Sequence, residues 1–232
     1  MNQPTAFDPY AETYDAACAE ALSVTGEDRA YFAEGRVRWL ARCLERIGES
    51  PRSALDFGCG PGSTAPILLR ELRLARCAGV DTSARLLELA QGAHGSSEIQ
   101  FLLAEEFNPD ASFDLAYCNG VFHHIPIGQR SANLDLIYCA LRPGGVFALW
   151  ENNPWNPATR YVMSNCSFDK DAVTISPPEA QRLLRGAGFD ILRTDFLFIF
   201  PRFLKSLRRL EEPLSRLPLG AQYQVLCRRP GN

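Results

Sequence analysis

A glycine-rich loop near residue 58 follows a short apolar segment, and such a loop can hold a nucleotide. Gly58, Gly60 and Gly62 occupy every second position. Glycine lets backbone N–H groups approach a ligand closely, and the N-terminus of a following helix favours negative charge. Asp56, just before the loop, would repel a pyrophosphate but attract an ammonium group. The dinucleotide fingerprint Gly-x-Gly-x-x-Gly would require glycine at Ser63, so we expect a ligand with a cationic amino-acid part instead.

Asp81 is a second acidic residue with a chemical reason for its position. It ends a short apolar segment and lies about 20 residues beyond the loop, the distance at which a βαβ unit places a carboxylate on a ribose. A carboxylate can accept hydrogen bonds from both ribose hydroxyls. An acid here could also serve as a charge at a helix N-terminus and nothing more. We favour the ribose role.

Two adjacent histidines, His123 and His124, follow the predicted strand 113–118. Ligands of open parallel sheets bind at the carboxyl ends of the strands, where a histidine can accept a proton or orient an acceptor. One of the pair is expected to point into the fold. Glu151, at the end of the predicted strand 146–150, is a further candidate base. No third ligand accompanies the histidines in the sequence, so no metal site is predicted.

The stretch that follows Glu151 is polar, aromatic and stiffened by proline. It would lie at the carboxyl edge of the sheet, where acceptors bind. A loop so rich in hydrogen-bond donors and acceptors favours a substrate pocket over a linker. The candidate acceptor-binding residues in it are Asn152, Asn153, Trp155 and Arg160.

Short apolar segments, which we predict to be strands, position these side chains and alternate with predicted helices. This alternation indicates an α/β fold. A helix start is clear at Ser176, where proline follows the cap and Glu179 stands three residues on, as in a capping box. A similar box is predicted from Thr25 to Asp28, in front of a scaffold helix. The strands are predicted at 54–57, 77–81, 99–103, 113–118, 146–150, 189–200 and 222–227.

Composition limits the kind of protein this is. The 232 residues fit one domain, and 46% hydrophobic with 22% charged residues is ordinary for a soluble chain. A net charge of −3 and a pI near 5.7 leave no basic footprint for nucleic acid. The eight cysteines form no Cys-x-x-Cys pair and indicate free thiols in a reducing compartment. Without a signal peptide or a long apolar run, the prediction is a cytoplasmic monomer or homodimer.

The segment from Asp56 to Gly62, Asp-Phe-Gly-Cys-Gly-Pro-Gly, resembles the first motif of the class I S-adenosylmethionine (SAM) methyltransferases. The Phe113-Asp114 opening of the fourth strand and the Leu-Arg-Pro-Gly-Gly element at 141–145 are similar to the same family. The resemblance covers roughly residues 54–190. It implies a Rossmann-like α/β fold with a seven-stranded, mostly parallel sheet and an antiparallel last strand, as a single domain over residues 1–232.

The resemblance also implies roles at the donor site. Asp56 and the glycine loop would hold the methionine part of SAM, and Asp81 its ribose. Glu105, with Glu106 as the alternative, would accept from the adenine amino group. The predicted cofactor-binding residues are Tyr14, Asp56, Gly58, Cys59, Gly60, Gly62, Asp81, Thr82, Glu105, Glu106 and Asn119.

The N-terminal segment 1–25 contains Tyr10 and Tyr14, which would share one face of a helix. They would pack on the domain, form a lid over the ligand, or do both. The family resemblance supports a lid, and it pairs His124 with Tyr10 or Tyr14 as a catalytic dyad. The predicted catalytic residues are therefore His124, His123 and Glu151, and Tyr10 joins the acceptor-binding set.

Residues 201–221 are predicted to be an insertion near the acceptor site. Apolar residues from Phe203 to Leu217 recur at helical spacing, interrupted by Pro213, with basic residues around them. We favour a helix packed on the acceptor side. A peripheral membrane contact through 201–217, or a dimer contact, would use the same pattern.

The expected reaction is transfer of the SAM methyl group to an O, N or C nucleophile of a small molecule, lipid-linked and sugar acceptors included. Holding donor and acceptor in line and close would supply most of the catalysis. One alternative is a SAM-binding regulatory protein without turnover, and another is a methyltransferase acting on macromolecules, which the acidic pI disfavours. A nicotinamide-dependent oxidoreductase is disfavoured by the glycine spacing and by Asp56.

Overall fold

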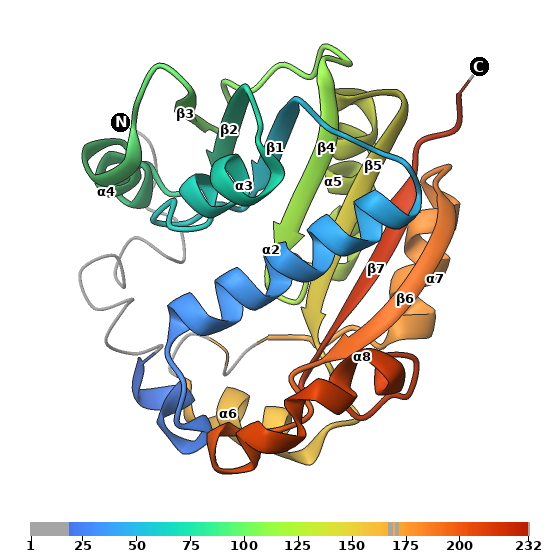
Figure 1. Cartoon of the computed structure of the whole chain (residues 1–232). Coiled ribbons are helices and arrows are strands. Elements are labelled where there is room, and N and C mark those ends of the chain that lie inside the picture. The colour runs from blue at the N-terminus through green and yellow to red at the C-terminus, as the bar shows by residue number, and fades with distance from the viewer. Residues whose placement is uncertain (1–18, 167–168, 170–171, 232) are drawn as a thin grey trace.

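The computed structural model describes residues 19–166, 169 and 172–231, which form a sheet with helices on both faces (Figure 1). Tyr10 and Tyr14 lie outside the described residues. The strands are β1 (Ser53–Phe57), β2 (Arg76–Asp81), β3 (Ile99–Leu103), β4 (Phe113–Asn119), β5 (Leu141–Asn152), β6 (Asp190–Leu197) and β7 (Gln222–Arg228).

The seven strands form one sheet in the order β3-β2-β1-β4-β5-β7-β6. Strands β1 to β5 pair in parallel, and β7 runs antiparallel to both of its neighbours, β5 and β6. The seven-stranded, mostly parallel sheet with an antiparallel last strand is therefore confirmed. The strand order reverses direction at β1 and β4, so a crevice opens at their carboxyl ends.

Each face of the sheet is covered by its own set of helices (Figure 1). On one side, Val37 and Leu40 pack with Leu68 against the central strands. On the other, Leu134 and Ile137 join Leu184 in a second apolar cluster. The covering helices are α2 (Arg29–Arg46), α3 (Ala65–Leu72), α4 (Ala84–His94), α5 (Arg130–Ala140) and α7 (Pro177–Gly186).

The two predicted helix caps differ in outcome. The capping box between Ser176 and Glu179 is present at the start of α7, as predicted. The box predicted at Thr25 is wrong, because α2 begins after Asp28, whose side chain accepts from the Tyr31 N–H at 2.8 Å. Thr25 instead ends a short 3-10 turn, η2 (Ser23–Thr25), and its hydroxyl donates to the Leu22 carbonyl.

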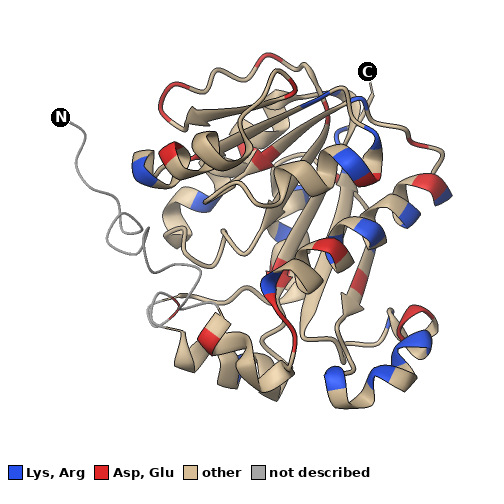
Figure 2. Ribbon diagram, turned by 60° about the vertical axis from the view of Figure 1, so that its left-hand side comes forward, with Lys and Arg blue, Asp and Glu red and all other residues tan. Residues whose placement is uncertain are grey.

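The segment 201–221 folds differently from the prediction. It forms a 3-10 helix, η4 (Arg202–Leu210), followed by the short helix α8 (Glu211–Leu214). The prediction of a packed apolar stripe is wrong, since Phe203 is 80% exposed and η4 contains no buried residue. A 3-10 helix has three residues per turn, so apolar residues spaced for an α-helix do not gather on one face. Figure 2 shows Lys and Arg along this segment.

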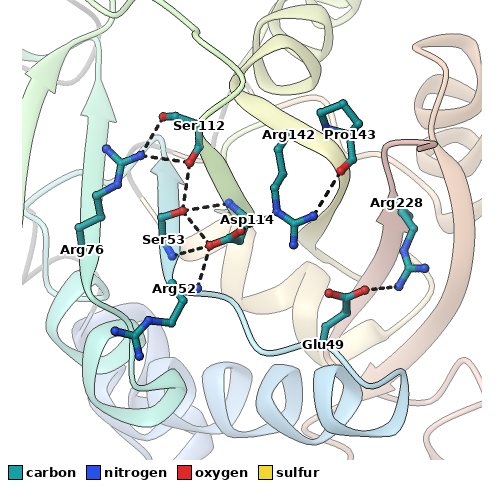
Figure 3. A network of polar contacts seen from close by, with 9 residues as sticks. All are labelled: Glu49, Arg52, Ser53, Arg76, Ser112, Asp114, Arg142, Pro143 and Arg228. Atoms are coloured by element: carbon teal, nitrogen blue, oxygen red, sulfur yellow. Dashed lines mark hydrogen bonds and ion pairs between the residues drawn. The ribbon is translucent and has the colours of Figure 1, made fainter. Parts of the chain in front are cut away.

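A polar network holds the edge of the sheet opposite the crevice (Figure 3). Asp114, at the start of β4, accepts from the Arg52 and Ser53 N–H groups at 2.8 and 2.9 Å, and from Arg142 Nε at 2.6 Å. The arginine lies in β5, which begins at Leu141 and not at residue 146. The predicted Arg-Pro-Gly-Gly turn lies within the bounds of this strand as an irregularity. Gly144 has φ +80°, and the pairing passes from Leu141–Phe113 directly to Val146–Leu115.

Seven cysteines fall within the described residues, and all seven are free, as predicted. Six are buried, and Cys139 on α5 is exposed. Among the described residues, no helix combines the length and the apolar character that a membrane span requires.

Candidate active site

A cavity of about 800 Å³ opens at the carboxyl ends of the central strands. Its wall combines the loop after β1, the inner face of α2, the ends of β4 and β5, and the helix α6 (Pro157–Asn165). The residues on this wall include Arg36, Asp56, Gly60, Asn119, Asn152 and Asp169. The crevice predicted from the strand order is therefore a real cavity, and part of segment 19–25 also lies on its wall.

The glycine loop presents bare backbone to this cavity. Gly58 has φ +72°, and a Cβ there would lie 2.3 Å from Val121 Cγ2, so a side chain does not fit. Gly60 has φ +54°, and a Cβ there would meet nothing within 4 Å. The loop is fixed by the Gly58 N–H, which donates to the Val80 carbonyl at 2.7 Å. Space for a ligand thus lies directly against the backbone at Gly60.

Asp56 is the charged group at the base of the loop. It is 3% exposed, and its Oδ2 atom is buried with no hydrogen-bond partner among the described residues. Burial and the neighbouring Asp81 carboxylate raise the pKa of Asp56 to about 7, against the opposing effect of Arg36. A buried carboxylate with a vacant oxygen on a cavity wall is a site for a cation. This arrangement fits the ammonium group that the sequence predicted.

Arg36 is a site residue that the sequence analysis missed. It is buried on α2, where its Nε donates to Tyr117 Oη and its Nη1 to Gln222 Oε1, each at 3.0 Å. Its guanidinium lies close enough to Asp56 to lower the pKa of that carboxyl. A signal was present, since Arg36 stands between Phe32 and Leu40 at four-residue spacing on the buried face of α2.

Asp81 contacts the glycine loop but is not part of the cavity wall that the described residues form. Its Oδ2 accepts from the Gly60 N–H at 2.8 Å and its Oδ1 from the Ser83 N–H at 2.9 Å. Thr82, Glu105 and Glu106 are exposed and are not part of the cavity wall that the described residues form. Gly62 packs against Phe101 and Ala90 and is absent from that wall. Of the other predicted cofactor residues, Cys59 and Asn119 do lie on it.

Three predicted catalytic residues form one cluster. His123 Nδ1 lies 2.5 Å from Glu151 Oε2, and Glu151 Oε1 accepts from the Phe122 N–H at 2.8 Å. Asp169 joins them: its Oδ1 lies 3.6 Å from His123 Nε2 and 3.2 Å from His124 Nε2. His123 is 4% exposed and points into the fold, as expected for one of the pair. Asp169, which the sequence analysis did not identify, reaches the cavity wall.

Charge and hydrogen bonding both shift the pKa values of this cluster. Burial would lower the pKa of His123, but the Glu151 and Asp169 carboxylates outweigh it and raise that pKa to about 10. Burial likewise opposes ionisation of Asp169, and hydrogen bonds from the two imidazoles overcome it, which lowers the pKa of Asp169 to about 2. In the absence of other ligands, the cluster is therefore a buried set of opposite charges.

The predicted acceptor-binding residues separate into two groups. Asn152 lies on the cavity wall, and its Oδ1 accepts from Gln222 Nε2. Asn153 is fully buried and donates to the Pro218 and Gly220 carbonyls, so its role is to hold two loops together. Trp155 stacks on Phe196, and Arg160 is exposed. The expectation that these last three line the pocket is not met in the described wall. Of the predicted insertion 201–221, only Ala221 contributes to that wall.

Residues 55–149 match a family model described as a methyltransferase domain. A trans-aconitate 2-methyltransferase of Methylobacterium radiotolerans is 31% identical over 168 residues, which cover 69% of this chain. The chain spans 64% of that relative's length.

Two solved structures share the fold over nearly the whole chain. One, titled a possible histamine N-methyltransferase from Thermotoga maritima, has a TM-score of 0.64 and 21% identity and covers 97% of this chain and 98% of its own. The other, the [4+2]-cyclase SpnF, has a TM-score of 0.63 and 17% identity and covers 100% and 99%. At these identities the likeness shows the fold alone.

Proposed function

Since residues 55–149 match a methyltransferase domain and the chain has the fold of the class I SAM-dependent methyltransferases that its motifs resemble, we propose that it transfers the methyl group of SAM to a small-molecule acceptor. SAM, when bound, supplies an electrophilic methyl group on a sulfonium. The work of the protein is to hold that group and the acceptor in line.

The vacant Oδ2 of Asp56 is the observation that supports the donor site most directly. An amino-acid ligand carries an ammonium and a carboxylate a few ångströms apart. Asp56 and the Arg36 guanidinium offer the two opposite charges beside one another on the cavity wall. Exposed backbone at Gly60 lets the ligand approach closely. Asp81, which accepts from the Gly60 N–H, is the proposed partner of the ribose hydroxyls.

Titration of the protein with SAM and with S-adenosylhomocysteine tests this site. Both ligands carry the same amino-acid part, so both are expected to bind the native chain. Asp56→Asn should weaken them about 10-fold or more, roughly 1.4 kcal/mol. Asp135→Asn, an exposed change on α5, serves as the matched control and should leave both affinities unchanged. No binding of SAM by the native chain would overturn the proposal.

For the acceptor, we infer a small molecule with a carboxylate or hydroxyl oxygen as the nucleophile. The name of the curated relative supports a carboxylate. The cavity volume of about 800 Å³ lies within the about 300–1,000 Å³ of ordinary small-molecule sites. A carboxylate is already ionised at neutral pH and needs no general base, whereas a hydroxyl would need one. For that second case, the partly exposed cluster of His124 and Asp169 is the proposed site of action on the hydroxyl proton.

Formation of S-adenosylhomocysteine from SAM, measured with trans-aconitate and with a panel of small carboxylates and hydroxy compounds, tests the reaction. Turnover with at least one acceptor is the expected result. One rival remains, a SAM-binding regulatory protein that does not transfer the methyl group. Tight SAM binding with no S-adenosylhomocysteine formed from any compound of the panel would favour that rival.

A further inference from the structure

Three side chains from separate parts of the chain meet at the edge of the cavity. His123 and His124 follow β4, and Asp169 follows α6 some 45 residues later. Their candidate ligand atoms, one imidazole nitrogen from each histidine and a carboxylate oxygen, all lie within 4.8 Å of one another. This convergence is not explained by the donor site, which lies at Asp56 and the glycine loop.

The distances within the cluster match those between ligands of one metal ion. Asp169 Oδ1 lies 3.2 Å from one Nε2 atom and 3.6 Å from the other. Ligand atoms of a tetrahedral zinc site, each about 2.0–2.1 Å from the metal, lie about 3.3 Å apart. An ion could therefore contact all three atoms if the Asp169 carboxylate moved by much less than one bond length. The two imidazole rings would also have to move slightly closer to the ion.

The surroundings of His123 are those of a metal ligand. Its Nδ1 is held at 2.5 Å by Glu151 Oε2, which leaves Nε2 toward Asp169. Glu151 is itself fixed by the Phe122 N–H and is 1% exposed. A carboxylate on the far nitrogen of a ligating histidine fixes the tautomer and the ring and makes the nitrogen a better donor. The chain after Asp169 is also tied back, because the Val173 N–H donates to the His123 carbonyl at 2.9 Å.

The charges favour a divalent ion as well. Two carboxylates face two imidazoles in a largely buried place. With both imidazoles neutral, the four groups carry two negative charges, which a divalent cation neutralises. Two imidazole nitrogens and one carboxylate oxygen are a donor set for Zn²⁺ and its neighbours in the first transition row, and not for Ca²⁺ or Mg²⁺.

We propose that His123, His124 and Asp169 form a binding site for a divalent transition-metal cation, with Zn²⁺ as the expected ion. Three protein ligands leave a coordination position open, which is the form of a catalytic and not of a structural zinc site. Asp169 lies on the cavity wall, so one of the three ligands borders the same space as the donor loop. Binding releases to solvent any proton held on the ligating nitrogens.

The use of the ion rests on the proposed function. In the open position it would bind a carboxylate or hydroxyl oxygen of the acceptor and hold it near the donor. A bound hydroxyl would lose its proton more readily, because the cation stabilises the oxyanion. The metal site itself does not depend on methyl transfer, so its test is made without SAM.

The test titrates chelator-treated protein with Zn²⁺ by calorimetry and with Co²⁺ by visible absorption, which reports tetrahedral nitrogen and oxygen ligands. One ion per chain is expected, with an absorption band from Co²⁺. His123→Ala and Asp169→Asn should each remove the band and weaken Zn²⁺ binding at least 100-fold. Glu151→Gln should weaken it about 10- to 100-fold and keep the stoichiometry. His94→Ala, which changes the remaining histidine of the chain, is the control and should bind as the native protein does.

Two results would overturn the proposal. One is no stoichiometric uptake of Zn²⁺ or Co²⁺ by the native chain, in which case the cluster is held by protons and hydrogen bonds alone. The other is uptake that survives in Asp169→Asn and His123→Ala, which would place the ion elsewhere. Thermal unfolding of the same variants shows that they are folded. Metal binding without methyl transfer would contradict the proposed function and leave the site standing.

Discussion

Among single residues, Asp56 shows how a fold prepares a carboxylate for a cation. It lies at the end of β1, shielded from water, with Asp81 on β2 and Arg36 on α2 as its nearest charges. The titratable groups of Cys59, Cys77 and Tyr117 also surround it, and burial raises the pKa of each of them. A pKa near 7 means that the carboxylate is poised between its neutral and charged forms at ordinary pH.

The affinity for SAM should therefore depend on pH through Asp56. Below its pKa of about 7 the carboxyl is neutral and attracts the ammonium weakly, and above it the group is charged. We expect the affinity to rise between about pH 6 and pH 7.5 as this proton is lost. The ligand's own α-amino group titrates higher, at about 7.7–8.0. Calorimetric titration at several pH values should show the rise in the native chain and a flat profile over the same range in Asp56→Asn.

Arg36 should bind the carboxylate of the amino-acid part of SAM. Arg36→Met removes the charge and leaves Tyr117 and Gln222 without their donor, so we expect about 10-fold or more loss of SAM affinity and a stability loss of about 1–3 kcal/mol. 5′-Methylthioadenosine, which lacks the amino-acid part, should bind native and variant chains alike. Equal losses for both ligands would assign Arg36 a purely structural role. Arg38→Met, exposed on the same helix, is the control.

At the scale of elements, strand positions followed from apolar runs, and the donor loop from its glycines. The ends of elements were harder to predict, because tertiary pairing decides them. Pro143 and Gly144 favour a turn locally, yet β5 extends through them since Leu141 pairs with Phe113. Phe198, with φ +62°, ends β6 before the predicted residue 200.

The residues of the candidate site also differ in whether local sequence or tertiary packing places them. Asp56, Asp81 and the two histidines sit beside recognisable strand ends, so local sequence located them. Arg36 and Asp169 could not be placed in this way, because only the packing of α2 on the sheet and the return of the chain after α6 bring them to the cavity. The sequence argued against a metal site because no third ligand could be recognised beside the histidines. Asp169 is the residue that the fold brings to that place.

Gly58→Ala tests the loop as an element. Its positive φ and the 2.3 Å approach of a Cβ to Val121 Cγ2 predict a strained, displaced loop. We expect a loss of about 1–3 kcal/mol in stability together with weaker SAM binding. Gly92→Ala, in α4 with nothing within 4 Å of the new atom, is the matched control and should raise stability by about 0.5–1 kcal/mol. Thermal unfolding measures both, and an unchanged midpoint for Gly58→Ala would contradict the strain.

At the scale of the whole molecule, exposed basic and apolar side chains gather on η4. Phe203 is 80% exposed, and Lys205 and Arg209 of the same short helix are exposed too. The segment is anchored by Arg208, whose Nη2 lies 2.7 Å from Glu27 just before α2. Glu212, in the adjoining α8, pairs with Arg42 and Arg46 of α2. An apolar tip with basic neighbours on a firm base suits an anionic lipid surface.

Sedimentation with phospholipid vesicles tests that surface. We expect binding to vesicles that contain anionic lipid, weaker binding at high salt, and little binding to neutral vesicles. Phe203→Ser with Lys205→Glu should reduce the bound fraction at least several-fold. Arg70→Glu, an exposed charge on α3, should not. Equal binding of all three proteins would exclude the segment as a membrane contact.

The hydrogen bonds of Asn153 have a consequence for the transfer of specificity between related proteins. Asn153 donates to the Pro218 and Gly220 carbonyls, Asn156 to Leu219, and Thr159 to Ala221. Segments 153–159 and 218–221 therefore form a single unit of exchange, although about 60 residues separate them. In a chimera that imports only one of them from a relative, the buried amide of Asn153 would face carbonyls of a different sequence, and the hydrogen bonds between the two segments would be lost or strained.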